Sequence, residues 1–271
     1  MISNTVAQTV QGDLDLFGHQ GQAKMYREFR PVYPQGLVQY VVSLVASADR
    51  NKYADVACGS GQLTSKIAPF FKHTVGVDKS FEQLNQATDV EVEWKPASAF
   101  DLPFPASSLD LVTVAQGLHW LLPYDAFFGQ VDRVLKSGGV FAAIAYAFPK
   151  VLDSDSNRIV RHFYEDLLGG LKSPGQEGCW WETNRPTIDG FYADVPFPPN
   201  HQTKHFLERV SLTVEHYTNY LRTLSAYRTL MRVNQPSIDP IDEIRDKLIM
   251  LSPNGTVDVE IDFFVVSYVK A

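Results

Sequence analysis

The chain has 271 residues, is 45% hydrophobic and carries a formal net charge of −7, which suits one large α/β domain or two small ones. A nucleic-acid-binding protein needs a basic surface, and this acidic composition argues against one. No apolar run approaches the length of a membrane span, and residues 1–4 lack the charged and apolar regions of a signal peptide. The two cysteines support neither a disulfide framework nor a metal cluster. We therefore expect a soluble cytoplasmic protein, a monomer or weak homodimer, with a small-molecule partner and without nucleic acid, membrane or metal.

The first helical pattern covers residues 22–31. Its apolar residues share one face with Tyr26, and Pro31 ends the helix. A second helix is expected over residues 37–46, packed outside the sheet. By itself this pattern indicates an amphipathic helix that covers the protein and leaves Arg30 exposed.

The segment 53–78 organises the chain. An apolar strand leads into a turn with Gly59 and Gly61, a helix extends to about residue 71, and a second strand ends at Asp78. This order is a βαβ unit, whose ligand binds at the carboxyl ends of the strands. The glycines can adopt positive φ and let a ligand approach the start of the helix, while the terminal carboxylate can accept both ribose hydroxyls. The segment therefore predicts a cofactor of the adenosine type.

Two residues of this segment bear on which cofactor is bound. The dinucleotide pattern G-x-G-x-x-G has a glycine where this chain has Thr64, which weakens the prediction of a bound pyrophosphate. Asp55 places a charge inside an apolar strand, where burial is costly without a partner. It either fixes the turn by accepting backbone N–H groups or reaches toward a cationic ligand.

Residues 55–61, which read DVACGSG, resemble the first motif of the class I S-adenosylmethionine-dependent methyltransferases, D-x-G-x-G-x-G. Ala57 stands in the place of the first glycine, a small-for-small change that should leave the turn intact. The resemblance implies S-adenosyl-L-methionine as the cofactor. It also implies a binding site that contains Asp55, Ala57, Gly59, Gly61, Asp78 and Lys79.

The N-terminal pattern Y-x-x-x-R-P-x-Y-P, from Tyr26 to Pro34, is similar to the lid of the trans-aconitate methyltransferase-like group. In that group the tyrosine and the arginine cover the cofactor and meet its methionyl carboxylate. The resemblance therefore implies this role for Tyr26 and Arg30, in place of a plain structural helix.

The next elements are a crossover helix over residues 80–87 with Ser80 as its N-cap, and an edge strand over residues 91–94. The loop that follows resembles the family's A-E-x-L-P segment, in which the acidic residue or the adjacent backbone holds the adenine amino group. Phe100 occupies the acidic position. Two alternatives follow for this loop. Either the backbone of Ala99 and Phe100 contacts the adenine and the ring of Phe100 stacks on it, or Phe100 is a core residue.

The strand 109–116 ends at Gln116, at the edge where an open sheet builds its site. A helix over residues 124–136, a C-capping turn over residues 137–139 and a strand over residues 140–146 follow. The stretch DRVLKSGG resembles the family's E-x-x-R-V-L-K-P-G-G. The resemblance extends from Tyr26 to Tyr146. It implies a Rossmann-like, doubly wound, seven-stranded sheet whose last strand is antiparallel.

The C-terminal half is expected to add a helix over residues 155–170 with Ile159, Phe163 and Leu167 inward. A loop-rich insertion over residues 173–192 covers the site. A strand, a helical region over residues 213–231, a further helix and a long final strand complete the chain. We expect a single methyltransferase domain, 1–271, in which 1–50 form the lid and first helix, 51–148 the cofactor-binding core, and 149–271 the substrate cap and last two strands.

Methyl transfer from a sulfonium is an in-line displacement, so the protein mainly aligns the two reactants. A base is needed only for an acceptor that is protonated at neutral pH. His119 is the candidate catalytic residue, with a pocket wall as the alternative, and Gln116 is expected beside the cofactor. Candidate substrate contacts, which could equally be core residues, are Trp120, Trp180, Trp181, Tyr217 and Tyr220.

These observations favour a small-molecule methyltransferase that acts on a carboxylate or hydroxyl oxygen. The alternatives are a nucleotide-dependent oxidoreductase, disfavoured by Thr64, and an inactive cofactor-binding scaffold whose lid contacts partners.

Overall fold

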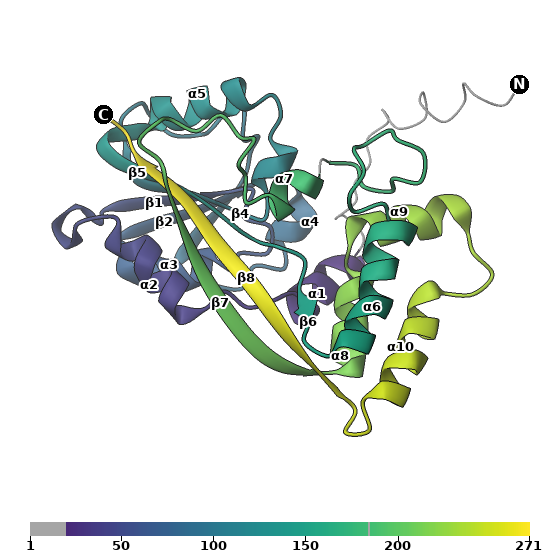
Figure 1. Cartoon of the computed structure of the whole chain (residues 1–271). Helices are drawn as coiled ribbons and strands as arrows, with labels where there is room; N and C mark the ends of the chain where they lie inside the picture. The colour runs from purple at the N-terminus through teal and green to yellow at the C-terminus, as the bar shows by residue number, and fades with distance from the viewer. Residues whose placement is uncertain (1–19, 184) are drawn as a thin grey trace, which may run out of the picture.

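The computed structural model describes residues 20–183 and 185–271 (Figure 1). Residues 1–4, on which the absence of a signal peptide was judged, lie outside this range. None of the helices described is long and apolar enough to cross a membrane.

The sheet has the strand order β3-β2-β1-β4-β5-β8-β6, and β7 pairs with β8. The first five strands of that order are parallel, and β8 runs antiparallel to β5, β6 and β7. The strands β1, β4 and β5 consist mainly of buried apolar residues because helices cover both faces of a parallel sheet. Their bounds are β1 Lys52–Val56, β2 His73–Asp78, β3 Val92–Pro96, β4 Leu109–Ala115, β5 Leu135–Tyr146, β6 Lys150–Val151, β7 Gln202–Thr213 and β8 Thr256–Val269.

This topology confirms the predicted Rossmann-like sheet with an antiparallel last strand. The described residues form eight strands where seven were expected. The additional one is β6, a two-residue strand that pairs with the middle of β8.

Two clusters of buried side chains pack on the two faces of the sheet. One joins Leu37 of α2, Ile144 of β5 and Tyr217 of α8. The other joins Val56 of β1 and Phe127 of α5. The helices nearest the sheet are α2 Gln35–Ser43, α3 Thr64–Ile67, α4 Phe81–Leu84, α5 Tyr124–Val134 and α7 Arg185–Asp189.

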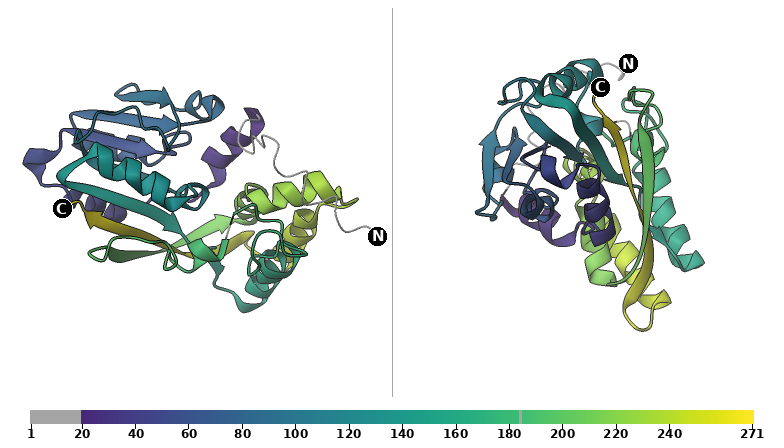
Figure 2. Two further views of the ribbon diagram at one scale, coloured as in Figure 1. Left: turned by 90° about the horizontal axis from the view of Figure 1, so that it is seen from above. Right: turned by 90° about the vertical axis from the view of Figure 1, so that its left-hand side faces the viewer.

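A group of helices stands at one end of the sheet, where β7 and β8 extend beyond the parallel strands (Figures 1 and 2). We call these the cap helices: α6 Ser154–His162, α8 Val214–Arg222, α9 Ser225–Asn234 and α10 Pro240–Leu251. In this group, α10 packs against both α6 and α8. The first described helix, α1 Gln20–Phe29, contacts α8 on the cap side and α4 on the sheet side. The N-terminal helix therefore bridges the sheet and the cap helices.

Three local predictions need correction. The helix after the glycine turn is only α3, followed by a 3₁₀ turn over Ala68–Phe70. The predicted capping turn 137–139 lies within β5, because the N–H of Gly138 donates to the carbonyl of Lys270 and continues the ladder to the last strand. After α6 the chain forms a π-helix over Phe163–Leu167, whose wider turn shifts the buried position from Leu167, which is 37% exposed, to Leu168.

Candidate functional site

The turn after β1 contains three residues with positive φ: Ala57 at 53°, Gly59 at 57° and Gly61 at 79°. Glycine adopts this region without strain, whereas an alanine costs about 1–2 kcal/mol there. The turn forms with Ala57 all the same, and the N–H of Cys58 donates to the carbonyl of Val77 in β2 at 3.1 Å. The predicted turn is therefore present, with a local steric cost at its first position.

A neighbouring side chain explains why position 61 must be glycine. A Cβ on Gly61 would lie 2.2 Å from the indole of Trp94 in β3, and a Cβ on Gly76 would lie 2.3 Å from the same ring. The Nε1 of Trp94 donates to the carbonyl of Asp89 at 3.1 Å, which holds the indole in place. The glycine turn thus rests on a tryptophan that the sequence analysis did not identify.

Asp55 is completely buried. Its carboxylate accepts hydrogen bonds from the hydroxyl of Thr64 in α3 at 2.6 Å and from the hydroxyl of Thr113 in β4 at 2.7 Å. The expected backbone N–H donors were wrong: both donors are threonine hydroxyls, because the register of β1 with β4 places Thr113 directly beside Asp55. Burial raises the pKa of Asp55 to about 6, and the two hydroxyl donors oppose that shift. Asp55 therefore holds the start of α3 to the centre of the sheet.

Asp78 ends β2 and is bound to the backbone on both sides. One carboxylate oxygen accepts the N–H of Gly59 and the other accepts the N–H of Ser80, each at 2.8 Å. Burial raises the pKa of Asp78, although both N–H donors lower it. The hydroxyl of Ser80 also accepts the N–H of Gln83, which confirms its predicted role as the N-cap of α4. Asp78 thus links the glycine turn to the end of the second strand.

The predicted adenine loop begins directly beside Asp78. The N–H of Ala97 donates to the backbone carbonyl of Asp78 at 3.0 Å. Ala99 is half-buried, and Phe100 is 39% exposed, so its ring is not a core residue. The backbone of this loop therefore stays near the carboxylate of the second strand.

The far end of the loop is held by two side chains of α5. Arg133 donates to the carbonyls of Leu102 and Phe104 at 2.8 and 2.7 Å. The amide oxygen of Gln130 accepts from Arg133 at 2.8 Å and from the N–H of Leu102 at 3.2 Å. Arg133 lies in the D-R-V-L-K-S-G-G stretch, which suggested a structural role but not this loop as its partner.

The carboxyl ends of β4 and β5 meet at Gln116. Its φ is 52°, its N–H donates to the carbonyl of Ile144 at 2.8 Å, and its side-chain amide donates to the carbonyl of Tyr146 at 3.3 Å. His119 follows in a short 3₁₀ turn and is buried, with its ring 5.6 Å from that of Trp120. The structure therefore brings Gln116 and His119 to the edge at which the sequence placed them.

Arg30 is half-buried between the end of α1 and the cap helices. Its guanidinium donates to the hydroxyl of Tyr146 at 3.2 Å and to the carbonyl of Thr223 at 3.0 Å. It also lies 4.5 Å from the ring centre of Tyr26 and 5.6 Å from that of Tyr220. Among the described residues it forms no ion pair, and its Nε is buried without a hydrogen-bond partner. The plain interpretation with an exposed arginine was wrong.

The N-terminal helix is also bound to the glycine turn and to the loop after α4. Arg27 donates to the carbonyl of Gln86 at 2.7 Å, and the amide of Gln62 donates to the carbonyl of Arg27 at 3.0 Å. A pocket of about 290 Å³ lies between this helix and the turn, with Gly61 and Lys66 in its lining. The helix is therefore in contact with both sides of the candidate site.

An aromatic cluster connects the cap helices to the end of β5. Tyr217 and Tyr220 are buried on α8, with their rings 5.9 Å apart. Phe148 stacks on Tyr164 at 3.9 Å, and the ring of Trp181 lies 5.7 Å from that of Tyr164. The cluster brings together the expected substrate residues Tyr217, Tyr220 and Trp181.

Two predicted residues are less closely associated with the site. Trp180 is half-buried, and its backbone N–H donates to the backbone carbonyl of Leu168. Lys79 has an exposed side chain beside Asp78. In the part of the chain that the structure describes, no group of three or more His, Cys, Asp or Glu side chains could hold a metal ion.

Comparisons with known proteins agree with this geometry. Residues 54–143 match the family Methyltransf_11, described as a methyltransferase domain. A Dictyostelium discoideum protein described as a candidate methyltransferase is 28% identical over 232 residues, which cover 84% of this chain and 83% of that protein. The probable S-adenosylmethionine-dependent methyltransferase CRG1 of Saccharomyces cerevisiae is 26% identical over 244 residues, which cover 80% of this chain and 83% of that protein.

A solved structure from Anaeromyxobacter dehalogenans, described as a candidate type II methyltransferase, has a TM-score of 0.74 and 27% identity. The match covers 89% of this chain and 98% of that one. The comparisons support a class I S-adenosylmethionine-dependent methyltransferase. They confirm the predicted fold, enzyme class and cofactor. The trans-aconitate methyltransferase-like group stays a prediction.

Proposed function

Since the chain has the fold and the methyltransferase domain of the class I S-adenosylmethionine-dependent enzymes, we propose that it methylates a carboxylate or hydroxyl oxygen of a small molecule and belongs to the trans-aconitate methyltransferase-like group. The observation that carries this proposal is Arg30. Its guanidinium is half-buried and forms no ion pair among the described residues, and its Nε is buried without a hydrogen-bond partner there. A buried cation is stabilised by an anion, and S-adenosylmethionine supplies a carboxylate.

The cofactor would extend from Asp78 to Arg30. Each oxygen of Asp78 accepts one N–H and has a lone pair left for a ribose hydroxyl. The adenine would lie against the loop of Ala99 and Phe100, whose partly exposed ring can stack on a base. The methionyl carboxylate would bind the Nε edge of Arg30, with Tyr26 closing over it.

The middle of the cofactor would lie over the turn of Ala57, Gly59 and Gly61, with Gln116 beneath the sulfonium and Lys79 at the outer rim. Asp55 serves this site indirectly, because its two hydrogen bonds to hydroxyls shape the turn. When bound, S-adenosylmethionine supplies the electrophilic methyl group. The residues of this chain align it with the acceptor and exclude water.

A nucleotide-dependent oxidoreductase fits the geometry less well. Thr64 occupies the third-glycine position with a side chain that donates to Asp55. The helix that would support a pyrophosphate, α3, has four residues. The antiparallel β8 also differs from the all-parallel sheet of a dinucleotide-binding fold.

The acceptor would enter between α1 and the cap helices. Tyr217, Tyr220 and Trp181 provide an apolar wall, with Trp120 and Trp180 toward its rim. His119 lies at the edge of the sheet where the methyl group would be presented. A carboxylate acceptor is already ionised at neutral pH, so His119 would act as a wall or hydrogen-bond donor and not as a base.

The remaining features of the proposal come from the sequence. We propose a single cytoplasmic domain with the divisions 1–50, 51–148 and 149–271, without nucleic-acid or membrane partners, and a monomer or weak homodimer. The buried cluster that joins α2, β5 and α8 supports one continuous core.

Calorimetry with S-adenosylmethionine, S-adenosylhomocysteine and NAD tests the cofactor assignment. We expect both sulfur compounds to bind and NAD not to bind. Asp78→Ala should weaken S-adenosylhomocysteine binding by about 1–3 kcal/mol, because two hydroxyls lose a charged acceptor. Binding of NAD alone, or unchanged affinity in folded Asp78→Ala, would refute the assignment.

A second measurement tests Arg30. Arg30→Met should weaken S-adenosylhomocysteine binding more than that of a decarboxylated analogue, because only the first has the carboxylate. The matched control is Arg158→Met, whose side chain is 77% exposed on α6. A turnover screen with carboxylic acids and alcohols then identifies the acceptor class, and failure of every acceptor would favour the inactive scaffold.

A further inference from the structure

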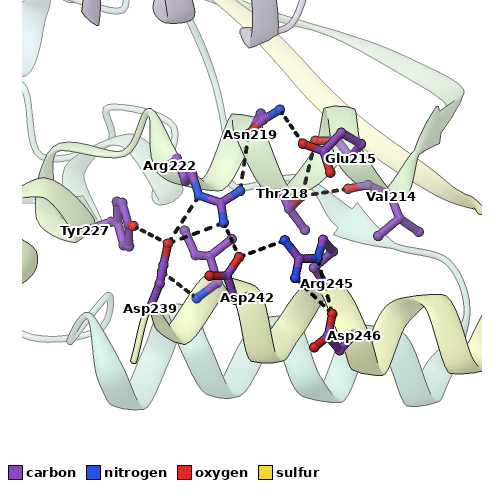
Figure 3. Close-up of polar contacts among 11 residues, drawn as sticks. Val214, Glu215, Thr218, Asn219, Arg222, Tyr227, Asp239, Asp242, Arg245 and Asp246 are labelled. Atoms are coloured by element: carbon purple, nitrogen blue, oxygen red, sulfur yellow. Dashed lines mark hydrogen bonds and ion pairs between the residues drawn. The ribbon is translucent and has the colours of Figure 1, made fainter. Parts of the chain in front are cut away.

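The turn between α8 and α9 is bracketed by two side chains that meet at one oxygen atom. Arg222 ends α8 and donates to the Oδ2 of Asp239 at 3.3 Å. Tyr227 lies in the following helix, and its hydroxyl donates to the same Oδ2 at 3.0 Å. Figure 3 shows both side chains pointing toward Asp239. The two-residue connection between the helices is therefore held from both ends.

Asp239 is itself fixed in position. Its other oxygen accepts the N–H of Ile241 at 2.9 Å, which makes it the N-cap of α10. Arg222 also donates to Asp242 at 2.8 Å and to the side chain of Asn219 at 3.2 Å. The side chain of Arg222 is only 19% exposed, so solvent screens these contacts less than those of a surface pair. The network thus joins α8, α9 and α10 through one arginine and one aspartate.

The bracketed turn contains the carbonyl group that holds Arg30. Thr223 directly follows Arg222, is the C-cap of α8, and accepts a hydrogen bond from the guanidinium of Arg30 at 3.0 Å. The ring of Tyr220, in the last turn of the same helix, lies 5.6 Å from that guanidinium. The C-terminal end of a helix carries a partial negative charge, which stabilises a cation there. Two of the contacts that locate Arg30 therefore belong to the end of α8.

We propose that Arg222 and Asp239 are positioning residues for Arg30. They fix the carbonyl of Thr223 and the ring of Tyr220, so that the free Nε edge of Arg30 is presented to the carboxylate of the cofactor. This inference rests on the proposed role of Arg30 in cofactor binding. A network that only stabilised the cap helices would affect folding but not the alignment of Arg30.

A double-mutant cycle separates these two roles. Arg222→Met should raise the dissociation constant for S-adenosylhomocysteine about tenfold, the effect of one lost hydrogen bond to a charged group. In the Arg30→Met background, Arg222→Met should change the dissociation constant by less than about twofold, because Arg30, through which Arg222 acts, is absent. Arg222→Lys should raise the dissociation constant by less than Arg222→Met does, since lysine keeps the charge but not the forked geometry.

The matched control is Arg158→Met. Arg158 pairs with Asp155 on α6, in the same group of helices, and shares no partner with Arg222, so its loss should leave the dissociation constant unchanged. If Arg222→Met does not fold, Asp239→Asn keeps the shape of the network and weakens the charge. If Arg222→Met weakens S-adenosylhomocysteine binding by the same factor in the wild-type and Arg30→Met backgrounds, the proposal is overturned.

Hydrogen exchange of the ligand-free protein provides a readout that is independent of cofactor binding. Arg222→Met should increase exchange in residues 24–31, which contain Arg30, whereas Arg158→Met should not. Unchanged exchange in this segment would refute the positioning role. If the wild-type protein binds no S-adenosylhomocysteine but Arg222→Met still increases exchange in residues 24–31, the proposed function is refuted. The structural coupling of Arg222 to Arg30 is then supported.

Discussion

The buried carboxylate of Asp55 predicts a specific dependence of stability on pH. Burial raises its folded-state pKa from 3.8 to about 6, so the folded protein binds a proton more readily than the unfolded chain does. The contribution is therefore favourable at low pH and is lost as the pH rises from about 4 through 6. A shift of about two pKa units, at 1.36 kcal/mol per unit, corresponds to about 3 kcal/mol of unfolding free energy.

The measurement is urea denaturation of the wild type and of Asp55→Asn between pH 4 and 8. The asparagine variant lacks the titration and can still accept one threonine hydroxyl. The pKa of Asp78 is also raised by burial, and the difference between the two proteins removes its contribution. We expect the stability of the wild type relative to the variant to fall by about 3 kcal/mol across this window. A flat difference, or one that rises with pH, would refute the assignment of a buried, destabilised carboxylate.

Four further predictions concern the turn, its supporting loop and the chemistry. Ala57→Gly should stabilise the protein by about 0.5–1 kcal/mol, because relief of the positive-φ cost exceeds the added entropy of the unfolded chain; a lower unfolding free energy would contradict this. Gly61→Ala should destabilise the protein by about 3 kcal/mol through its clash with the indole, and Trp94→Leu should relieve part of that loss in the double variant. Arg133→Lys should reduce the preference for S-adenosylhomocysteine over its inosine analogue, because the lysine cannot hold both loop carbonyls; an unchanged ratio of affinities would exclude a role in adenine recognition. His119→Gln should lower the rate less than tenfold with a flat pH profile for a carboxylate acceptor, whereas a loss of about a hundredfold or more together with an acid limb would make it a general base.

The sequence predicted most of the local structure. The alternation of apolar runs with glycine turns located the parallel strands, and the hydroxyl at Ser80 correctly marked the start of a helix. Such signals depend on residues within a few positions of one another. For the same reason they failed at Leu167, where a π-helix changes the local period without a clear mark in the residue pattern.

The partners of the site residues were beyond the reach of these local patterns. Asp55 was recognised as an anomalous charge, but its partner Thr113 lies 58 positions away and is brought beside it by the pairing of β1 with β4. Trp94 was read only as part of an edge strand, although its indole explains the glycine at position 61. The sequence indicated which residues were unusual and left open what each of them contacts.

By itself the sequence determined the order of the parallel strands, the glycine turn and the carboxylate that ends the second strand, because these follow from backbone preferences and short-range periodicity. Only the tertiary structure decided the environment of Arg30. Its hydrogen-bond partners lie 116 and 193 positions away, on the last parallel strand and at the end of a cap helix. Whether a charge is exposed or buried, and whether an acid stands beside it, depends on how distant segments pack. Because of that packing, an arginine at the end of an amphipathic helix is a half-buried cation whose Nε is buried without a hydrogen-bond partner among the described residues.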